Sequence, residues 1–235
     1  MFGLQRVGDL AWAAGDIQAR GFLIGGTAGR TTLAGEGLQH QDGHSQLLAS
    51  VIPNCVSYDP AFSYELAVIV QDGLRRMFGQ KENIYYYITV MNENYVHPPM
   101  PKGAETGILK GLYLLKKARR ARKATPRVRL MGSGTILNEA LAAGELLMRD
   151  YGVQSDIWSV TSFNELTRDG RAASRHNRYH PEGSVRNAYV TQCLENDDAP
   201  VIAATDYVQS YADQIREFVP ARYVVLGTDG FGRSG

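Results

Sequence analysis

Short apolar segments alternate with amphipathic segments along almost the whole chain, and this rhythm limits the folds that the sequence can adopt. The apolar segments are rich in β-branched and aromatic residues and are short enough to be buried strands. They lie at 22–26, 52–59, 82–92, 127–134, 155–162, 199–206 and 222–229. Because strands that alternate with helices form βαβ units, the pattern predicts an α/β fold with mostly parallel sheets.

The amphipathic segments predict the helices of this fold. They lie at 4–20, 60–79, 105–117, 135–152 and 206–219. Apolar residues at helical spacing predict the buried face of the first helix: Leu4, Val7, Leu10, Ala14 and Ile17. Asp59-Pro60 predicts the start of the second helix, because proline is tolerated in a first helical turn.

The clearest break in the rhythm is residues 92–104, which include three prolines. The helix predicted at 105–117 follows the break, and a basic segment without an apolar face comes after it. We therefore expect two mostly parallel α/β domains, one at 1–104 and one at 127–235, joined by a linker at 105–126.

The segment from Gly25 to Ser45 contains six glycines and no helix or strand periodicity. Connections of this length are either functional or disordered, and both interpretations fit the segment. His40 follows Glu36 by four residues, close after a predicted strand, where ligands of α/β sheets bind. These two residues are our candidates for catalysis. His44 is a weaker candidate, because residues 42–45 also fit a turn that leads into a helix.

Composition favours a globular protein without a strong electrostatic field. The 25 basic and 24 acidic residues give a net charge of +1, so charge indicates neither a nucleic-acid nor a membrane partner. No apolar run is long enough to span a bilayer. Cys55 and Cys193 lie in apolar surroundings and are expected to be reduced thiols of a cytoplasmic protein.

Three further motifs are better explained by structure than by chemistry. The GSG at 132–134 lacks the third glycine of a dinucleotide fingerprint and predicts a tight strand-to-helix turn. The basic run 116–123 has no interleaved aromatic residue and predicts a solvated linker face rather than a nucleic-acid site. His176 and His180 have the spacing of metal ligands on a helix, but no third ligand is evident nearby, so we assign no metal site.

The chain resembles a known family in several segments. They include the run GEGLQHQDGHS at 35–45, SYDPAFSYELAVI at 57–69, YYYITVMNENY at 85–95, GSGTILNEA at 132–140 and VLGTDGFGRS at 225–234. These segments resemble the decarboxylating first component of the bacterial, homodimeric type of pyruvate dehydrogenase complex. That component is a transketolase-like thiamine diphosphate enzyme with three α/β domains. The resemblance implies that residues 1–104 are the later part of its pyrimidine-binding middle domain and that 127–235 are a truncated C-terminal domain.

The resemblance also implies roles for individual residues. His40 matches the family's active-centre histidine, which would bind pyruvate and transfer a proton. Glu36 and Arg6 match charged residues of the active-centre surroundings, Glu36 as a catalytic and Arg6 as a cofactor-binding residue. Phe2 matches an aromatic residue that packs around the aminopyrimidine ring. The implied partners are thiamine diphosphate, Mg²⁺, a second copy of the chain, and the lipoyl domain of the acyltransferase subunit.

Some features depart from the family pattern. The diphosphate- and magnesium-binding GDG motif is absent, and the GTDG at 227–230 does not replace it. Gln41 stands where the family often has an acidic residue, and the basic run 116–123 is unusual. We therefore expect this chain to be a piece of a longer protein and inactive alone. Two alternatives are a related enzyme that uses another 2-keto acid or a keto sugar, and a non-catalytic module that binds an acidic partner.

Overall fold

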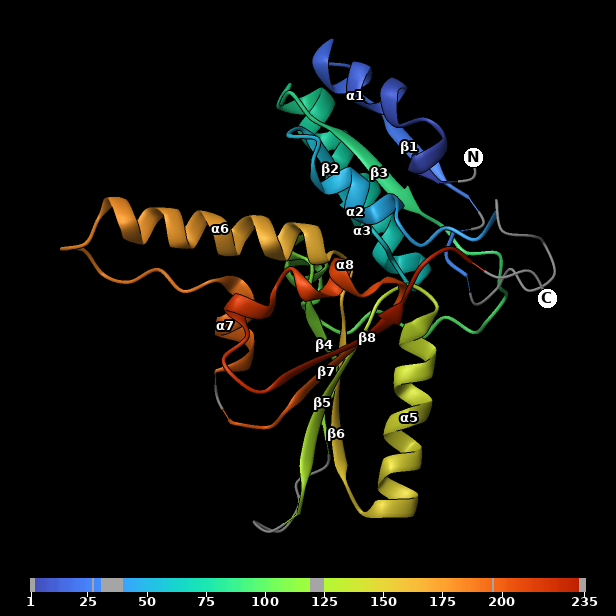
Figure 1. Ribbon diagram of the computed structural model, residues 1–235, viewed down its shortest axis with the longest axis vertical. Coiled ribbons are helices and arrows are strands. Elements are labelled where there is room, and N and C mark those ends of the chain that lie inside the picture. The colour runs from blue at the N-terminus through green and yellow to red at the C-terminus, as the bar shows by residue number, and fades with distance from the viewer. Residues whose placement is uncertain (1–2, 27, 31–39, 119–124, 196, 233–235) are drawn as a thin grey trace.

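The computed structural model describes residues 3–26, 28–30, 40–118, 125–195 and 197–232, and within them the chain forms two sheets (Figure 1). The first has the order β1-β3-β2. Its strands are β1 (Phe22–Gly25), β2 (Cys55–Tyr58) and β3 (Tyr85–Thr89). The second has the order β4-β6-β5-β7-β8. Its strands are β4 (Tyr113–Lys116), β5 (Arg127–Gly132), β6 (Gln154–Ser159), β7 (Val201–Val208) and β8 (Tyr223–Thr228). Every described pair is parallel except β4 with β6, which confirms the predicted fold class.

Helices cover both faces of the first sheet. Those on one face are the 3₁₀ turn η1 (Leu4–Arg6), α1 (Gly8–Asp16) and α2 (Ser45–Ser50). Those on the other are α3 (Ser63–Leu74), its π-helical extension η3 (Arg75–Gly79) and α4 (Glu105–Lys110). The central strand β3 alternates between the two cores: Tyr85 and Tyr87 pack on the first side, Tyr86 and Ile88 on the second. A run of four apolar residues is what a strand buried on both faces requires.

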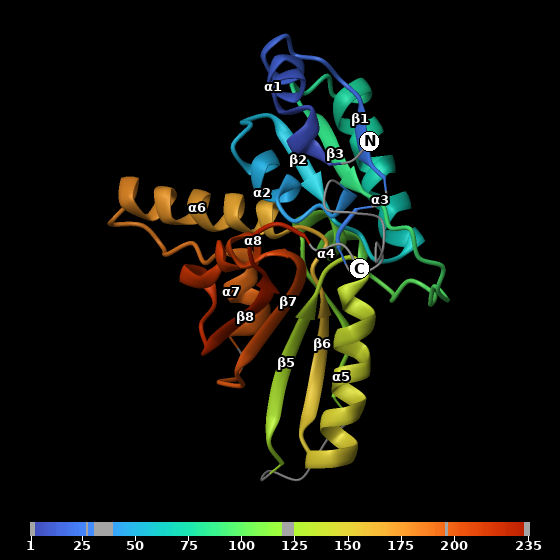
Figure 2. The same ribbon diagram turned by 45° about the vertical axis from the view of Figure 1, so that its right-hand side comes forward.

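The second sheet is also covered on both sides. Helix α5 (Ile136–Tyr151) lies along one face, beside β6 (Figure 2). The other face packs against α6 (Phe163–Tyr179), α7 (Tyr189–Leu194), α8 (Gln209–Asp213) and the 3₁₀ turn η4 (Arg216–Phe218). Helix α6 extends sideways from the body of the molecule (Figure 1). The turn at 132–134 leads directly from β5 into α5, as expected from the sequence.

The two sheets meet at the carboxyl ends of their parallel strands (Figures 1 and 2). Directly after β2, the amide of Asp59 donates to the carbonyl of Thr161 after β6, at 2.8 Å. The amide of Gly134, after β5, donates to the carbonyl of Asp59 at 3.1 Å. Since ligands of open α/β sheets bind at strand carboxyl ends, the junction of the two sheets is the first place to look for a site.

The first helix differs from its prediction. The predicted helix 4–20 is a 3₁₀ turn followed by α1, which ends at Asp16. Leu10 and Ile17 were expected in the core but are 71% and 75% exposed. The buried face carries Ala11 and Gly15 instead, because small residues let the helix approach the β2 side closely.

Three other boundaries also differ from the predictions. The predicted helix 105–117 ends at Gly111, whose φ of 98° lies in the left-handed region, and the chain then forms β4. This strand pairs with β6 through peptide hydrogen bonds, which outweigh the local helical pattern. Strand β7 runs on to Val208, so the helix predicted at 206–219 is reduced to α8 and η4. The helix predicted to start at Asp59-Pro60 begins at Ser63.

Glu65 fixes the start of α3 and ties it to the second sheet. One carboxylate oxygen accepts the amides of Ala61 and Phe62 at 2.6 and 3.0 Å. The other accepts the hydroxyls of Tyr113 on β4 and Ser159 on β6, both at 2.6 Å. The side chain is fully buried, and burial raises the pKa of its carboxyl group.

We expect Glu65→Ala to lower the free energy of unfolding by about 3 kcal/mol, because two amides and two hydroxyls lose their buried acceptor. Glu65→Gln should lose less, since the amide oxygen still accepts hydrogen bonds. The measurement is urea unfolding followed by circular dichroism. The matched control is Glu182→Ala, on the exposed loop after α6, which should change the value by less than about 0.5 kcal/mol. A loss below about 1 kcal/mol for Glu65→Ala would contradict the assignment.

Candidate active centre at the junction of the two sheets

The segment that carries His40 begins and ends at the junction of the sheets. The amide of Ala28 donates to the carbonyl of Val90 after β3, at 3.1 Å. The amide of Asp42 donates to the carbonyl of Gly29 at 3.1 Å and closes the base of the segment. Most of its middle, including Glu36, lies outside the described residues.

The start of the chain lies against the end of this segment. The amide of Leu4 donates to the Ser45 hydroxyl at 2.6 Å. Gly3 lies beside the Asp42 carboxylate, where its positive φ of 79° and lack of a side chain permit the close approach. The structure therefore brings the start of the chain, which carries Arg6, next to the end of the segment that carries His40, although the two are more than 30 positions apart in the sequence.

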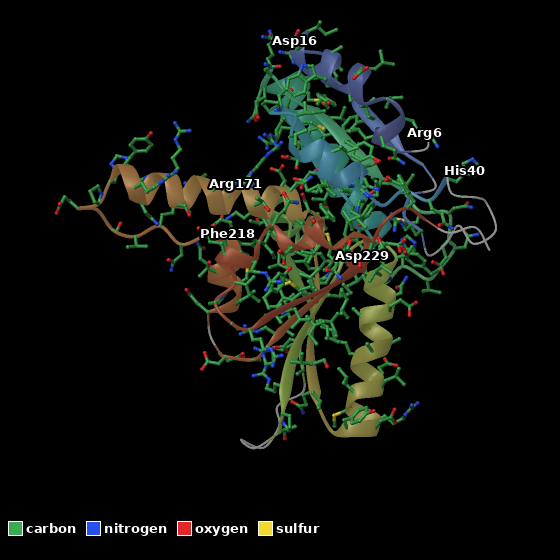
Figure 3. All side chains as sticks on the ribbon, viewed as in Figure 1. Arg6, Asp16, His40, Arg171, Phe218 and Asp229 are labelled. Atoms are coloured by element: carbon green, nitrogen blue, oxygen red, sulfur yellow. The ribbon has the colours of Figure 1, made fainter. Side chains whose placement is uncertain are left out.

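Of the four predicted site residues, the structure describes Arg6 and His40. Both lie on the same side of the molecule in Figure 3. His40 is half-buried, and Arg6 is exposed on η1. Phe2 and Glu36 lie outside the described residues, so their predicted roles stay predictions.

Asp42 organises the turn that follows His40. Its Oδ1 accepts the amides of His44 and Ser45, each at 3.0 Å, at the start of α2. The alternative interpretation of residues 42–45, a turn into a helix, is therefore confirmed. The carboxylate is 1% exposed, and its Oδ2 has no hydrogen-bond partner among the described residues. A buried carboxylate oxygen in this state is free to accept a hydrogen bond from a ligand.

A second carboxyl group, Asp59, lies at the centre of the junction. The Thr89 hydroxyl, at the end of β3, donates to its Oδ1 at 2.6 Å. The Tyr207 hydroxyl, on β7, donates to the same oxygen at 3.4 Å. The Gln46 amide extends the network, donating to the Thr89 hydroxyl at 3.0 Å. Strand ends of both sheets therefore converge on the Asp59 side chain, and helix α2 is connected to it through Thr89.

Burial raises the pKa of Asp59 from 3.8 to about 7. Hydrogen bonds from Thr89, Ser133 and Tyr207 oppose this rise, and the charge of Asp206 adds to it. The same environment raises the pKa of the Tyr207 phenol. Near neutral pH the junction can thus hold a carboxyl group that exchanges a proton, which is the property that acid–base chemistry needs.

The structure describes the histidine pair of α6 and only part of the basic run. The His176 and His180 rings are 4.6 Å apart on the exposed end of α6, but the described part of the chain contains no group of three residues able to hold a metal ion. Lys116 in β4 pairs with Glu145 at 3.6 Å, and residues 119–124 of the basic run are outside the described ranges. Within these ranges no helix is long and apolar enough to cross a membrane.

Sequence reasoning missed Asp59, Thr89 and Asp206 as residues of this junction. A signal was present for Asp59 and Asp206, because each is the last residue of a predicted strand, whereas Thr89 lies inside the predicted strand 82–92. Asp59 was instead interpreted as the start of a helix. Only the meeting of the two sheets shows that these strand ends face each other.

We expect the stability of the chain relative to its Asp59→Asn variant to fall as pH rises from about 4 to about 7. The folded chain keeps the Asp59 proton over this range whereas the unfolded chain releases it, so stability is lost until the folded pKa is passed. The difference between pKa values of 3.8 and about 7 corresponds to about 4 kcal/mol. Urea unfolding at several pH values measures it, with the exposed Asp198→Asn as control. A pH-independent difference between wild type and Asp59→Asn would contradict the prediction.

Comparison with known proteins identifies the family. Residues 1–98 match the family model of the pyruvate dehydrogenase E1 component middle domain. Residues 111–235 match the model of the transketolase-like TK C-terminal domain. The chain is 62% identical over 235 residues to the pyruvate dehydrogenase E1 component of Pseudomonas aeruginosa. It is 60% identical over 234 residues to that of Cupriavidus necator and 59% identical over 236 residues to that of Escherichia coli K12.

Solved structures show the same fold at low sequence identity. Transketolase from Campylobacter jejuni superimposes with a TM-score of 0.68 and 17% identity, over 100% of this chain and 31% of that one. A transketolase variant from Pichia stipitis gives a TM-score of 0.64 and 14% identity, over 96% and 29%. The matches to the three E1 components cover 100% of this chain and 26% of each relative. The chain thus belongs to the transketolase-like family through its TK C-terminal domain at residues 111–235. Over its whole length it is similar to pyruvate dehydrogenase E1 components, and it spans about a quarter of the length of these relatives.

Proposed function

We propose that this chain is part of a thiamine diphosphate-dependent pyruvate dehydrogenase. The whole enzyme would decarboxylate pyruvate and reductively acetylate the lipoyl group of the acyltransferase subunit. One observation carries the proposal: identity to E1 components is 56–62% over the whole chain, whereas identity to transketolases of the same fold is 14–17%. This contrast supports pyruvate as the substrate over a keto sugar.

The residues of this chain fit only part of the cofactor. The buried Asp42 Oδ2, without a partner among the described residues, lies beside Gly3 at the start of the chain and can accept a hydrogen bond from the cofactor. The proposed role of Phe2 and Arg6 at the ring end of the cofactor rests on the family resemblance. No described group of acidic or imidazole side chains could hold Mg²⁺, so the metal would be bound by other parts of the polypeptide. Because the sequence lacks the GDG motif, we assign the diphosphate to those parts as well.

Thiamine diphosphate would supply the electron sink for decarboxylation, and the chain's own residues would handle substrate and protons. His40 would hydrogen-bond pyruvate and transfer a proton, with Glu36 as a second catalytic group in the same segment. Because the metal- and diphosphate-binding parts would lie elsewhere, the chain would be inactive by itself.

We also propose the domain division 1–104 and 127–235, with 105–126 as the connection. Strand β4 lies within this connection and pairs in the second sheet, so the connection would be ordered over that part. The proposed partners are a second copy of the chain and the lipoyl domain. The free thiols of Cys55 and Cys193 support a cytoplasmic location.

We expect His40→Ala, made in the longer polypeptide that carries this segment, to lower kcat for pyruvate by about 10²–10⁴-fold, because a positioned proton-transfer group is removed. The assay would contain thiamine diphosphate and Mg²⁺ and follow pyruvate-dependent reduction of an artificial electron acceptor. His180→Ala, on the exposed end of α6, is the matched control and should keep wild-type turnover.

The possible outcomes separate the alternatives. Unchanged turnover in His40→Ala would refute the role given to this histidine. Turnover by the wild type with another 2-keto acid or with a keto sugar, but not with pyruvate, would assign the protein to a related transketolase-like enzyme.

A further inference from the structure

Strand β7 of the second sheet holds both ends of the segment that carries His40. At the start of the segment, the Arg30 amide donates to Oδ2 of Asp206 at 2.5 Å. At its end, the Val208 amide donates to the carbonyl of Gly43 at 2.9 Å. Asp206 and Val208 are two residues apart on the same strand, so a single element holds both attachments.

The Arg30 side chain adds a third attachment to the second sheet. Its Nη2 donates to the carbonyl of Gly230, after β8, at 2.8 Å. Its Nη1 reaches the carbonyl of Asp229 at 3.5 Å. The guanidinium therefore connects the start of the His40 segment to a second strand end of the same sheet.

The contact with Asp206 depends on the backbone shape of Gly29. Its φ of 83° lies in the left-handed region, and a side-chain carbon added there would overlap the Asp206 carboxylate. Asp206 is 7% exposed, so its carboxylate has little water to hydrogen-bond with, and a peptide amide is a strong partner for it. Because a side chain at position 29 would displace the Asp206 carboxylate, the contact between Asp206 and the Arg30 amide requires glycine at this position.

We propose that Asp206 is a positioning residue for the reaction, acting through the Arg30 amide on the segment that carries His40. The inference rests on the proposed function of His40 and assigns the C-terminal unit a role in the active centre. The segment is closed at its base by the bond between Asp42 and Gly29, and Asp206 fixes that base against β7. A displacement of about 1 Å in a catalytic group can reduce a rate by about 10²-fold.

The test uses the longer polypeptide with thiamine diphosphate and Mg²⁺. We expect Asp206→Ala to lower kcat for pyruvate about 10- to 100-fold with little change in KM. Asp206→Asn keeps an oxygen that can accept the Arg30 amide and should recover part of the rate. Gly29→Ala should reproduce the loss, because it displaces the same carboxylate. Asp198→Ala, at an exposed position, is the control and should be unaffected.

A double-mutant cycle distinguishes positioning from a general loss of stability. If Asp206 acts through His40, adding Asp206→Ala to His40→Ala should lower kcat by less than about 3-fold, because the group being positioned is already absent. An equal loss in both backgrounds would overturn the inference while leaving the proposed function intact.

Hydrogen exchange gives a readout that does not depend on activity or on the cofactor. Asp206→Ala should accelerate exchange in peptides that contain Arg30 and Gly43 and leave peptides from β5 and β6 unchanged. Unchanged exchange at Arg30 and Gly43 would overturn the inference. If the wild type shows no turnover of pyruvate, the proposed function fails, and hydrogen exchange alone decides whether Asp206 holds the segment.

Discussion

Buried carboxyl groups connect the two sheets, and the rest of the structure depends on them. Glu65 links the start of α3 to β4 and β6, Asp59 links the ends of β2 and β3 to β7, and Asp206 links β7 to the segment that carries His40. Removing a carboxyl group from water is unfavourable, so each must collect donors that replace the lost hydration. Those donors come from both sheets, and the requirement sets how the sheets are placed relative to each other.

This arrangement gives the junction its chemical character. The carboxyl ends of strands from both sheets point toward one region. Backbone and side-chain groups at these strand ends form hydrogen bonds with groups of the other sheet. Burial raises the pKa of Asp59 to about 7, so the region can hold a proton near neutral pH. Asp42 keeps one buried oxygen without a partner among the described residues. The buried Asp59 carboxyl group and the Asp42 oxygen without a described partner each cost folding free energy, because each is removed from water. Each is useful where a ligand accepts or donates a hydrogen bond and a proton is transferred.

The fold class and every described strand except β4 were predictable from the sequence, and the buried face of the first helix was not. A run such as Tyr85–Thr89 is apolar throughout because both faces of its strand are buried, and this holds in any fold. The face of α1 was predicted from large apolar residues, but Leu10 is exposed and Gly15 is buried. How closely a helix approaches its sheet decides which face is buried, and local spacing does not contain that information. The segment after Gly111 forms β4 for a similar reason, since only pairing with β6 supplies its hydrogen bonds.

By itself, the sequence determined the α/β class, the parallel strands, the family resemblance, and His40 as the residue of interest. These follow from periodicity and from short motifs, which are local properties of the chain. Only the tertiary structure decided that Asp59 and Asp206 belong to the junction at which the segment carrying His40 begins and ends. The three lie far apart in the sequence, and each carboxyl group alone resembles an ordinary turn residue. The physical reason is that their role arises from desolvation and from donors on other elements, and both exist only once the two sheets have packed together.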